Sequence, residues 1–124
     1  MRTLTDHIVS GDQAVQLVIS VLDEPGAGGA NHAYQIMYLS DEHKAYVATP
    51  ICFQNGPIKE AGVNGITQEA LLAIVIDRLR SFQAGPYACA DNQEALEHCQ
   101  AALTALQRRT LARIARGVEG TMEK

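Results

Sequence analysis

Positive charge is scarce in this sequence. Ten Lys and Arg residues stand against fourteen Asp and Glu residues, which gives a formal net charge of -4. Proteins that coat nucleic acid or anionic membranes need a broad basic surface that releases counterions. The composition therefore excludes polymeric nucleic acid and membrane surfaces as partners, and any anion site must be local.

Long hydrophobic runs and paired cysteines are also lacking. The first residues, MRTLTDHIVSGDQAVQL, do not have the layout of a signal peptide, and no run reaches the length of a membrane span. Cys52, Cys89 and Cys99 are odd in number and have no C-x-x-C spacing, which favours reduced thiols over a disulfide framework. We therefore expect a cytoplasmic protein.

Signatures of catalysis and of metal binding are missing as well. The four histidines show no nucleophile and base pattern and no metal-ligand spacing with the cysteines or acids. The acid pairs Asp23-Glu24 and Asp41-Glu42 are more typical of solubilising turns than of a hydrolytic dyad. The glycines at 26–29 lack the strand, the helix and the Lys-Ser/Thr of a P-loop. We expect no enzyme, no cofactor and no metal ion.

The sequence does have enough apolar residues for one hydrophobic core. Its 124 residues are 47% hydrophobic, which predicts a single domain spanning 1–124. Residues 1–65 are expected to be rich in β-strands, and residues 66–124 to form a helical hairpin with a short tail. The predicted fold class is α+β, with an N-terminal antiparallel β-sheet followed by a C-terminal antiparallel two-helix hairpin.

The first half predicts strands because β-branched and aromatic residues alternate with turn-forming residues. The four expected strands cover residues 3–9, 15–22, 33–39 and 45–53. The segment DEPGAGGANH, residues 23–32, holds one Pro and three Gly and is expected to be a hairpin loop without regular structure. A turn signal at residues 55–57 precedes a last short strand that ends at residues 64–65.

The second half predicts two helices. The first begins after Thr67, a capping residue, and ends at Phe82. After a break with Gly and Pro, the second begins at Asp91 or Asn92 and runs to residue 116, where a glycine caps it. A seam at three- and four-residue spacing should pack on the first helix or on another subunit, and consists of Leu96, Cys99, Leu103, Leu106, Thr110 and Ile114.

Arginines crowd the end of the second helix. Four of the ten basic residues lie within residues 108–116, and three of them, Arg109, Arg113 and Arg116, share one flank and are called the arginine stripe. Such spacing costs a few tenths of a kcal/mol unless an anion lies between the guanidinium groups. Because Arg binds phosphate bidentately and stacks on adenine-type rings, the stripe favours a phosphorylated small molecule. The alternative is a solvated face that meets the helix dipole.

Two residues at the hairpin turn add to this interpretation. Phe82 offers a ring that can stack on a base, and Asn92 offers an amide that can read a base edge. The alternative for Phe82 is an ordinary place in the hydrophobic core.

Several motifs in fixed order resemble the Thoeris anti-defence sponge family of phages. They are FQNGPIKEAGVNGITQEALLAIVIDRLRSFQAGPYAC, an Asn that opens a helix, and then RRT and ARGVEGT, which together span Phe53 to Thr121. The helical hairpin also resembles that of the anti-CBASS cyclic-nucleotide sponges. The resemblance implies the sheet and hairpin described above, and a homodimer that assembles to a hexamer.

The resemblance also implies a ligand. Members of the family bind glycocyclic ADP-ribose, the signal made by a TIR-domain protein, and hold it without cleavage, so that the Thoeris effector is not activated. Some members also bind cyclic di- or trinucleotides. Carried onto this sequence, the family pocket implies that the ligand-binding residues are Phe82, Asn92, Arg109 and Arg113. Residues with a supporting role would be Arg116, Gln83, Glu119 and Thr121.

The sequence departs from the family pattern at three places. Residues 89–92 read Cys-Ala-Asp-Asn where many relatives read Cys-Arg-Glu-Asn, Ala105 replaces a common Trp, and Met122 replaces a common His. These departures affect pocket edges and subunit packing. Enclosing a dinucleotide-sized ligand needs walls on several sides, so we expect pockets at or near a subunit interface. Two rivals stay open, namely an enzyme that degrades the same signal and a phage protein-interaction module.

Overall fold

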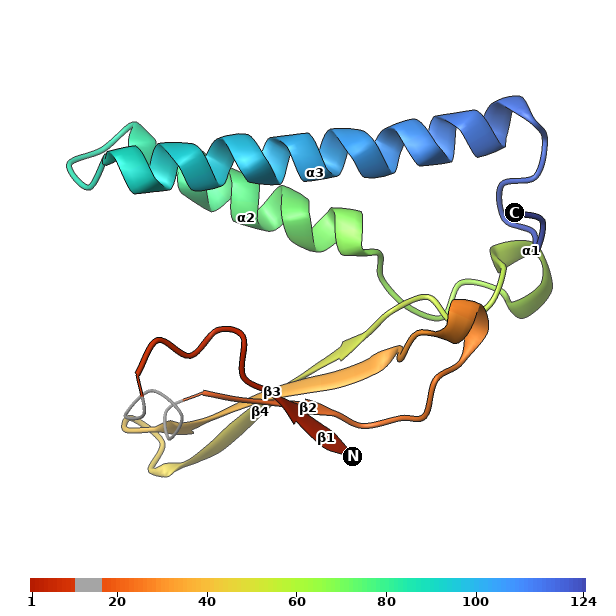
Figure 1. Cartoon of the computed structure of the whole chain (residues 1–124). Coiled ribbons are helices and arrows are strands. Elements are labelled where there is room, and N and C mark those ends of the chain that lie inside the picture. The colour runs from red at the N-terminus through yellow and green to blue at the C-terminus, as the bar shows by residue number, and fades with distance from the viewer. Residues whose placement is uncertain (11–16) are drawn as a thin grey trace. The chain divides into compact units, whose positions relative to one another are not determined.

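The chain divides into two compact units. The computed structural model describes residues 1–10 and 17–124, and the units are Met1–Ile66 and Thr67–Lys124. The first unit is a β-sheet and the second a pair of helices (Figure 1). This confirms the α+β class, and the boundary lies one residue from the predicted division between 65 and 66. The prediction of a single domain stays a prediction.

The sheet of the first unit has four antiparallel strands in the order β1-β2-β3-β4. They are β1 (Arg2–Leu4), β2 (Val18–Val21), β3 (Ala33–Ser40) and β4 (Ala45–Cys52). β3 and β4 form the longest pair, with a register that runs from Ala33 opposite Cys52 to Ser40 opposite Ala45. Val21 is only 1% exposed, and the rings of Tyr34 and Phe53 meet edge to face with centroids 5.6 Å apart.

The first two predicted strands are longer than the observed ones. The strand expected at 3–9 ends at Leu4, because the Ile8 amide donates to the Thr5 carbonyl at 3.0 Å and closes a turn. The strand expected at 15–22 is observed at Val18–Val21, and residues 15 and 16 lie outside the described residues. The strands expected at 33–39 and 45–53 agree with β3 and β4 within one residue.

The prediction of a last short strand ending at 64–65 is wrong. A single helical turn, α1 (Ile58–Ala61), follows Pro57, whose φ of -65° suits the start of a helix. Gly62 then ends this turn at a φ of 75°. The chain returns to the sheet with one parallel bridge, between Phe53 and Ile66.

The loop at residues 23–32 is more regular than predicted. It contains a short 3-10 turn, η2 (Ala27–Gly29), and hydrogen bonds span its two sides. The Asp23 carboxylate accepts from the His32 amide at 3.0 Å, and this bond holds the pKa of the Asp23 carboxyl below its usual value. The His32 ring Nε2 lies 2.9 Å from the Ala27 carbonyl oxygen. The segment is the predicted hairpin connection between β2 and β3, and outside η2 it has no regular secondary structure, as expected.

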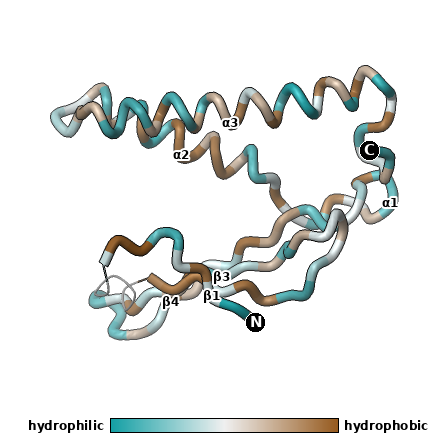
Figure 2. The backbone as a smooth tube through the Cα atoms, in the orientation of Figure 1, coloured by the Kyte–Doolittle hydropathy of each residue, from teal (hydrophilic) through white to brown (hydrophobic). Residues whose placement is uncertain are grey.

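The second unit is the predicted hairpin of α2 (Gln68–Gln83) and α3 (Ala90–Ala115). Thr67 caps α2 as expected, since its hydroxyl oxygen accepts from the Ala70 amide at 3.2 Å. Along both helices apolar and polar positions alternate (Figure 2), as helices with one apolar side require. Ile76 of α2 and Leu96 of α3 are the buried hydrophobic residues of this hairpin.

The predicted seam on α3 holds for most of its length but not at its end. The first five seam residues are buried or half-buried, whereas Ile114 is 56% exposed. The reason is length, because α3 has 26 residues and α2 only 16. The last turns of α3 therefore have no counterpart on α2.

The ends of α3 differ slightly from the prediction. The helix starts at Ala90 rather than at Asp91 or Asn92, because the Cys89 sulfur acts as the N-terminal cap and accepts from the Asn92 amide at 3.4 Å. The helix ends at Ala115 rather than Arg116. Gly117 follows at a φ of 73°, which confirms the predicted glycine at the C-terminal end.

Candidate functional site

The turn between α2 and α3 presents an aromatic ring to solvent. Phe82 lies in the last turn of α2 and is 40% exposed, so it is not a core residue. The guanidinium carbon of Arg78 lies 5.5 Å from the centroid of the Phe82 ring, which is cation-π distance. One face of the ring thus carries a cation. Sequence reasoning missed Arg78, although an Arg and a Phe at i and i+4 on a helix are a recognisable pair.

Asn92 lies in the first turn of α3, close to the same turn. Its side-chain nitrogen donates to the Tyr87 carbonyl at 3.5 Å, and its backbone amide donates to the Cys89 sulfur. In the described part of the chain, the side-chain oxygen of Asn92 accepts no hydrogen bond. This oxygen and one side-chain N–H are therefore available to a ligand. We call Arg78, Phe82 and Asn92 the turn end of the hairpin.

The Gln83 side chain bridges the two sides of the turn with hydrogen bonds. Its side-chain oxygen accepts from the Cys89 amide at 3.1 Å, and its side-chain nitrogen donates to the Cys89 carbonyl at 3.2 Å. The same nitrogen donates to the side-chain oxygen of Gln93 at 3.3 Å. These bonds join the last residue of α2 to the cap and first turn of α3.

At the other end of α3, Arg113 is engaged by the C-terminal tail. The residue is 9% exposed, and its Nε donates to the Glu119 carboxylate at 3.2 Å. One terminal nitrogen donates to the carbonyls of Val118 at 3.0 Å and Thr121 at 3.1 Å, and the other donates to the Glu123 carbonyl. Four of the five guanidinium N–H groups are thus used.

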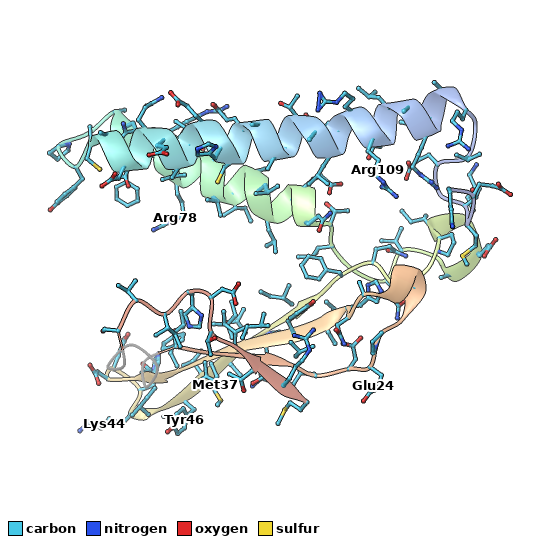
Figure 3. All side chains as sticks on the ribbon, in the orientation of Figure 1. Glu24, Met37, Lys44, Tyr46, Arg78 and Arg109 are labelled. Atoms are coloured by element: carbon cyan, nitrogen blue, oxygen red, sulfur yellow. The ribbon has the colours of Figure 1, made fainter. Side chains whose placement is uncertain are left out.

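Arg109 and Arg116 differ from Arg113. Arg116 is exposed and donates to the Lys124 carbonyl. Arg109 is exposed and makes no hydrogen bond or ion pair with any residue in 1–10 or 17–124, and its side chain extends away from α3 (Figure 3). The arginine stripe is therefore not uniform. Arg109 keeps all five donors open to an anion, whereas Arg113 keeps one.

The predicted site residues form two groups at opposite ends of α3. Asn92 and Arg109 are seventeen residues apart on one continuous helix. At a rise of 1.5 Å per residue, their Cα atoms are about 25 Å apart. Phe82 lies with Asn92, and Arg113 with Arg109. One hairpin thus does not bring the ring and amide together with the arginines, and a cyclised dinucleotide is too short to touch both groups.

Two hollows on the hairpin lie away from these residues. The larger, of about 600 Å³, has an almost entirely apolar lining of Gln68, Leu71, Leu72, Val75, Ala102, Ala105 and Leu106. The smaller, of about 450 Å³, is lined by Glu69, Gln107, Thr110 and Leu111. Neither lining includes a basic side chain, so neither hollow by itself suits a phosphate.

The described residues hold neither a metal-binding cluster nor a membrane-spanning helix. Among residues 1–10 and 17–124, no three His, Cys, Asp or Glu side chains are grouped closely enough to hold a metal ion. In the same part of the chain, no helix is both long enough and apolar enough to cross a bilayer. All three cysteines are free thiols.

Comparison with known proteins links the hairpin to phage proteins. The family described as Acb2/Tad1, hairpin domain, matches residues 50–111. A protein named Thoeris anti-defense 1, from Bacillus phage SBSphiJ7, is 47% identical over 72 residues, which are 58% of this chain. The chain spans about half the length of that relative, 51%. The family match includes Phe82, Asn92 and Arg109 and ends before Arg113.

Proposed function

The chain belongs to the Acb2/Tad1 hairpin-domain family, and from this membership we propose that it is a phage anti-defence protein. In this proposal it binds glycocyclic ADP-ribose, the TIR-derived signal, and sequesters it without cleavage, so that the bacterial Thoeris effector stays inactive. Cyclic di- or trinucleotides are further candidate ligands. The observation that carries the proposal is the set of groups at the two ends of the hairpin. One end has the exposed ring of Phe82 and the amide of Asn92 with free hydrogen-bonding groups, and the other end has the unpaired guanidinium of Arg109 among the described residues.

Each site residue has a chemical role in this proposal. Phe82 stacks on the adenine with the ring face that Arg78 does not cover. Asn92 bonds to a base or ribose edge through its free amide groups. Arg109 and Arg113 hold the diphosphate, with Arg109 supplying a bidentate pair and Arg113 its one remaining N–H.

We propose that two chains build each site, because the two groups of residues lie at opposite ends of one hairpin. A two-fold axis between antiparallel hairpins sets the turn end of one against the arginines of the other, and does so twice. Each pocket then has walls from two protomers, as burial of most of a nucleotide requires. This geometry supports the proposed homodimer. The family resemblance supports its further assembly, in which such dimers build a hexamer.

The supporting residues act through the tail and the turn. Glu119 and Thr121 accept hydrogen bonds from Arg113 and fix the direction of its guanidinium group. Arg116 donates to the Lys124 carbonyl and so secures the last residue of the tail. Gln83 acts at the turn, through its hydrogen bonds to Cys89.

A protein that competes by mass action must bind its ligand tightly. A nanomolar dissociation constant corresponds to about -12 kcal/mol of binding free energy. Bidentate phosphate contacts together with base stacking in a dry, two-sided pocket are the kinds of contact that reach this value.

The decisive experiment separates sequestration from degradation. The protein is incubated with glycocyclic ADP-ribose, unbound ligand is removed, the protein is denatured by heat, and the supernatant is analysed by chromatography. Recovery of intact ligand supports the proposal, and a cleaved product identifies an enzyme instead. A protein-interaction module would give no thermal shift with any cyclic nucleotide.

A further inference from the structure

Gln83 has no hydrogen-bond donor left for a ligand. Its side-chain nitrogen carries two N–H groups, and they point to the Cys89 carbonyl and to the side-chain oxygen of Gln93. Its side-chain oxygen already accepts from the Cys89 amide. The side chain therefore holds both backbone polar groups of Cys89 at once.

Cys89 is in turn hydrogen-bonded to the first turn of α3. The Cys89 sulfur accepts from the Asn92 backbone amide at 3.4 Å, and the Cys89 carbonyl accepts from the Gln93 amide at 3.1 Å. A continuous path of hydrogen bonds thus runs from the end of α2 to the first turn of α3. Its first residue follows Phe82 directly in the chain, and its last is the amide-bearing residue of the turn end.

The backbone hydrogen bonds of the turn between the two helices are local. It contains a Gly and a Pro, residues 85 and 86, and its backbone bonds include Gly85 to the Phe82 carbonyl at 3.2 Å and Ala88 to the Gly85 carbonyl at 3.3 Å. Side chains that bridge such a segment restrict its conformations and so fix what lies on either side.

We infer that Gln83 is a positioning residue, which sets the amide of Asn92 relative to the ring of Phe82 through its hydrogen bonds to Cys89. The inference rests on the proposed function for its ligand, but not for its geometry. A base stacked on Phe82 then meets the Asn92 amide without further ordering of the turn, which lowers the entropy lost on binding.

The geometry is tested in the free protein by hydrogen exchange. Gln83→Met keeps the length of the side chain and removes all three hydrogen bonds, and Gln83→Glu removes the two donations. Gln100→Met, in the middle of α3, is the matched control because Gln100 makes no side-chain hydrogen bond among the described residues. We expect faster exchange of the Cys89 and Asn92 amides in Gln83→Met and wild-type exchange in Gln100→Met.

Binding is tested by calorimetry with glycocyclic ADP-ribose at a temperature where all variants are folded. Gln83→Met should bind roughly tenfold more weakly than wild type, with Gln83→Glu between them. In an Asn92→Ala background the same Gln83→Met change should cost almost nothing, because its effect passes through Asn92. Additive losses would instead mean that Gln83 contacts the ligand itself.

The outcomes for the inference and for the proposed function are distinct. Wild-type exchange at Asn92 in Gln83→Met overturns the inference, whether or not the nucleotide binds. Wild-type affinity in Gln83→Met overturns it as well. A wild-type protein that binds no glycocyclic ADP-ribose overturns the proposed function, and the exchange measurement then still decides whether Gln83 holds Asn92.

Discussion

The two ends of the hairpin differ in what their hydrogen bonds hold in place, which is the backbone at one end and a side chain at the other. At the turn end, the backbone is tied by Gln83 while Phe82 and Asn92 keep free surface. At the other end, the tail ties down the guanidinium of Arg113 and leaves Arg109 open. A row of like residues on one helix flank therefore need not share one role, since the chain around each residue decides how many hydrogen-bond donors remain free.

The largest expected effect concerns Arg109. Arg109→Ala should weaken the binding of glycocyclic ADP-ribose by roughly a hundredfold or more, because a bidentate, charge-assisted pair of hydrogen bonds is lost. Arg108→Ala is the matched control, since it removes the same charge from the adjacent position. Calorimetry on both variants makes the comparison, and equal losses would mean that net charge alone attracts the ligand.

A mixing experiment tests whether the two ends meet across a subunit interface. Phe82→Ala and Arg109→Ala proteins should each bind poorly, but mixed dimers contain one pocket with both residues intact. After the two proteins are unfolded and refolded together, we expect binding at up to about one pocket in each mixed dimer, measured as calorimetric stoichiometry. No recovery, with mixed dimers shown by native mass spectrometry, would place the whole site within one chain.

The free energy of unfolding should fall more in Arg113→Ala than in Arg109→Ala. Arg113→Ala removes four hydrogen bonds to the tail, so we expect a loss of about 1–3 kcal/mol in the free energy of unfolding. Arg109→Ala should leave this free energy within about 0.5 kcal/mol of wild type, as for most exposed residues. Urea unfolding followed by circular dichroism measures both, and similar losses for the two variants would mean that the tail contacts of Arg113 do not stabilise the fold.

The smallest expected effect concerns Arg78. Its cation-π contact orders one face of Phe82, and exposed contacts of this kind contribute about 0.5–1 kcal/mol. Arg78→Ala should therefore weaken nucleotide binding about threefold. Arg80→Ala, which removes the same charge two residues further along α2, should change the dissociation constant less. If Arg80→Ala has the larger effect, the ring contact does not matter for binding.

Sequence reasoning succeeded where the chemistry is local. Thr67 and Gly117 mark helix ends because capping depends on the residue itself and its nearest neighbours. It failed at α1, where the path is fixed by contacts between distant residues. The Gln54 side chain bonds to backbone groups of Gly62 and Asn64, and the Asn64 side chain bonds to the backbone of Asn55. A Cβ on Gly65 would lie 2.4 Å from the Phe53 carbonyl carbon.

The candidate site was harder to foresee than the fold. The sequence pattern marked Arg109 and Arg113 as equivalent, because both lie on one helix flank. The acceptors that engage Arg113 are mostly backbone carbonyls of the tail, which any residue carries and which therefore leave no signal in the sequence. The same holds for Gln83, whose main partners are the backbone groups of Cys89.

Because α3 is one unbroken helix, its length sets the distance between the two ends of the hairpin. An insertion of four residues between Asn92 and Arg109 would lengthen the helix by about 6 Å and rotate its end by only about 40°. The helix caps and the tail contacts would not change, yet in the proposed dimer the register between the two hairpins would shift. Insertions and deletions in the middle of α3 thus offer a route by which such a scaffold could be retuned to longer or shorter messengers.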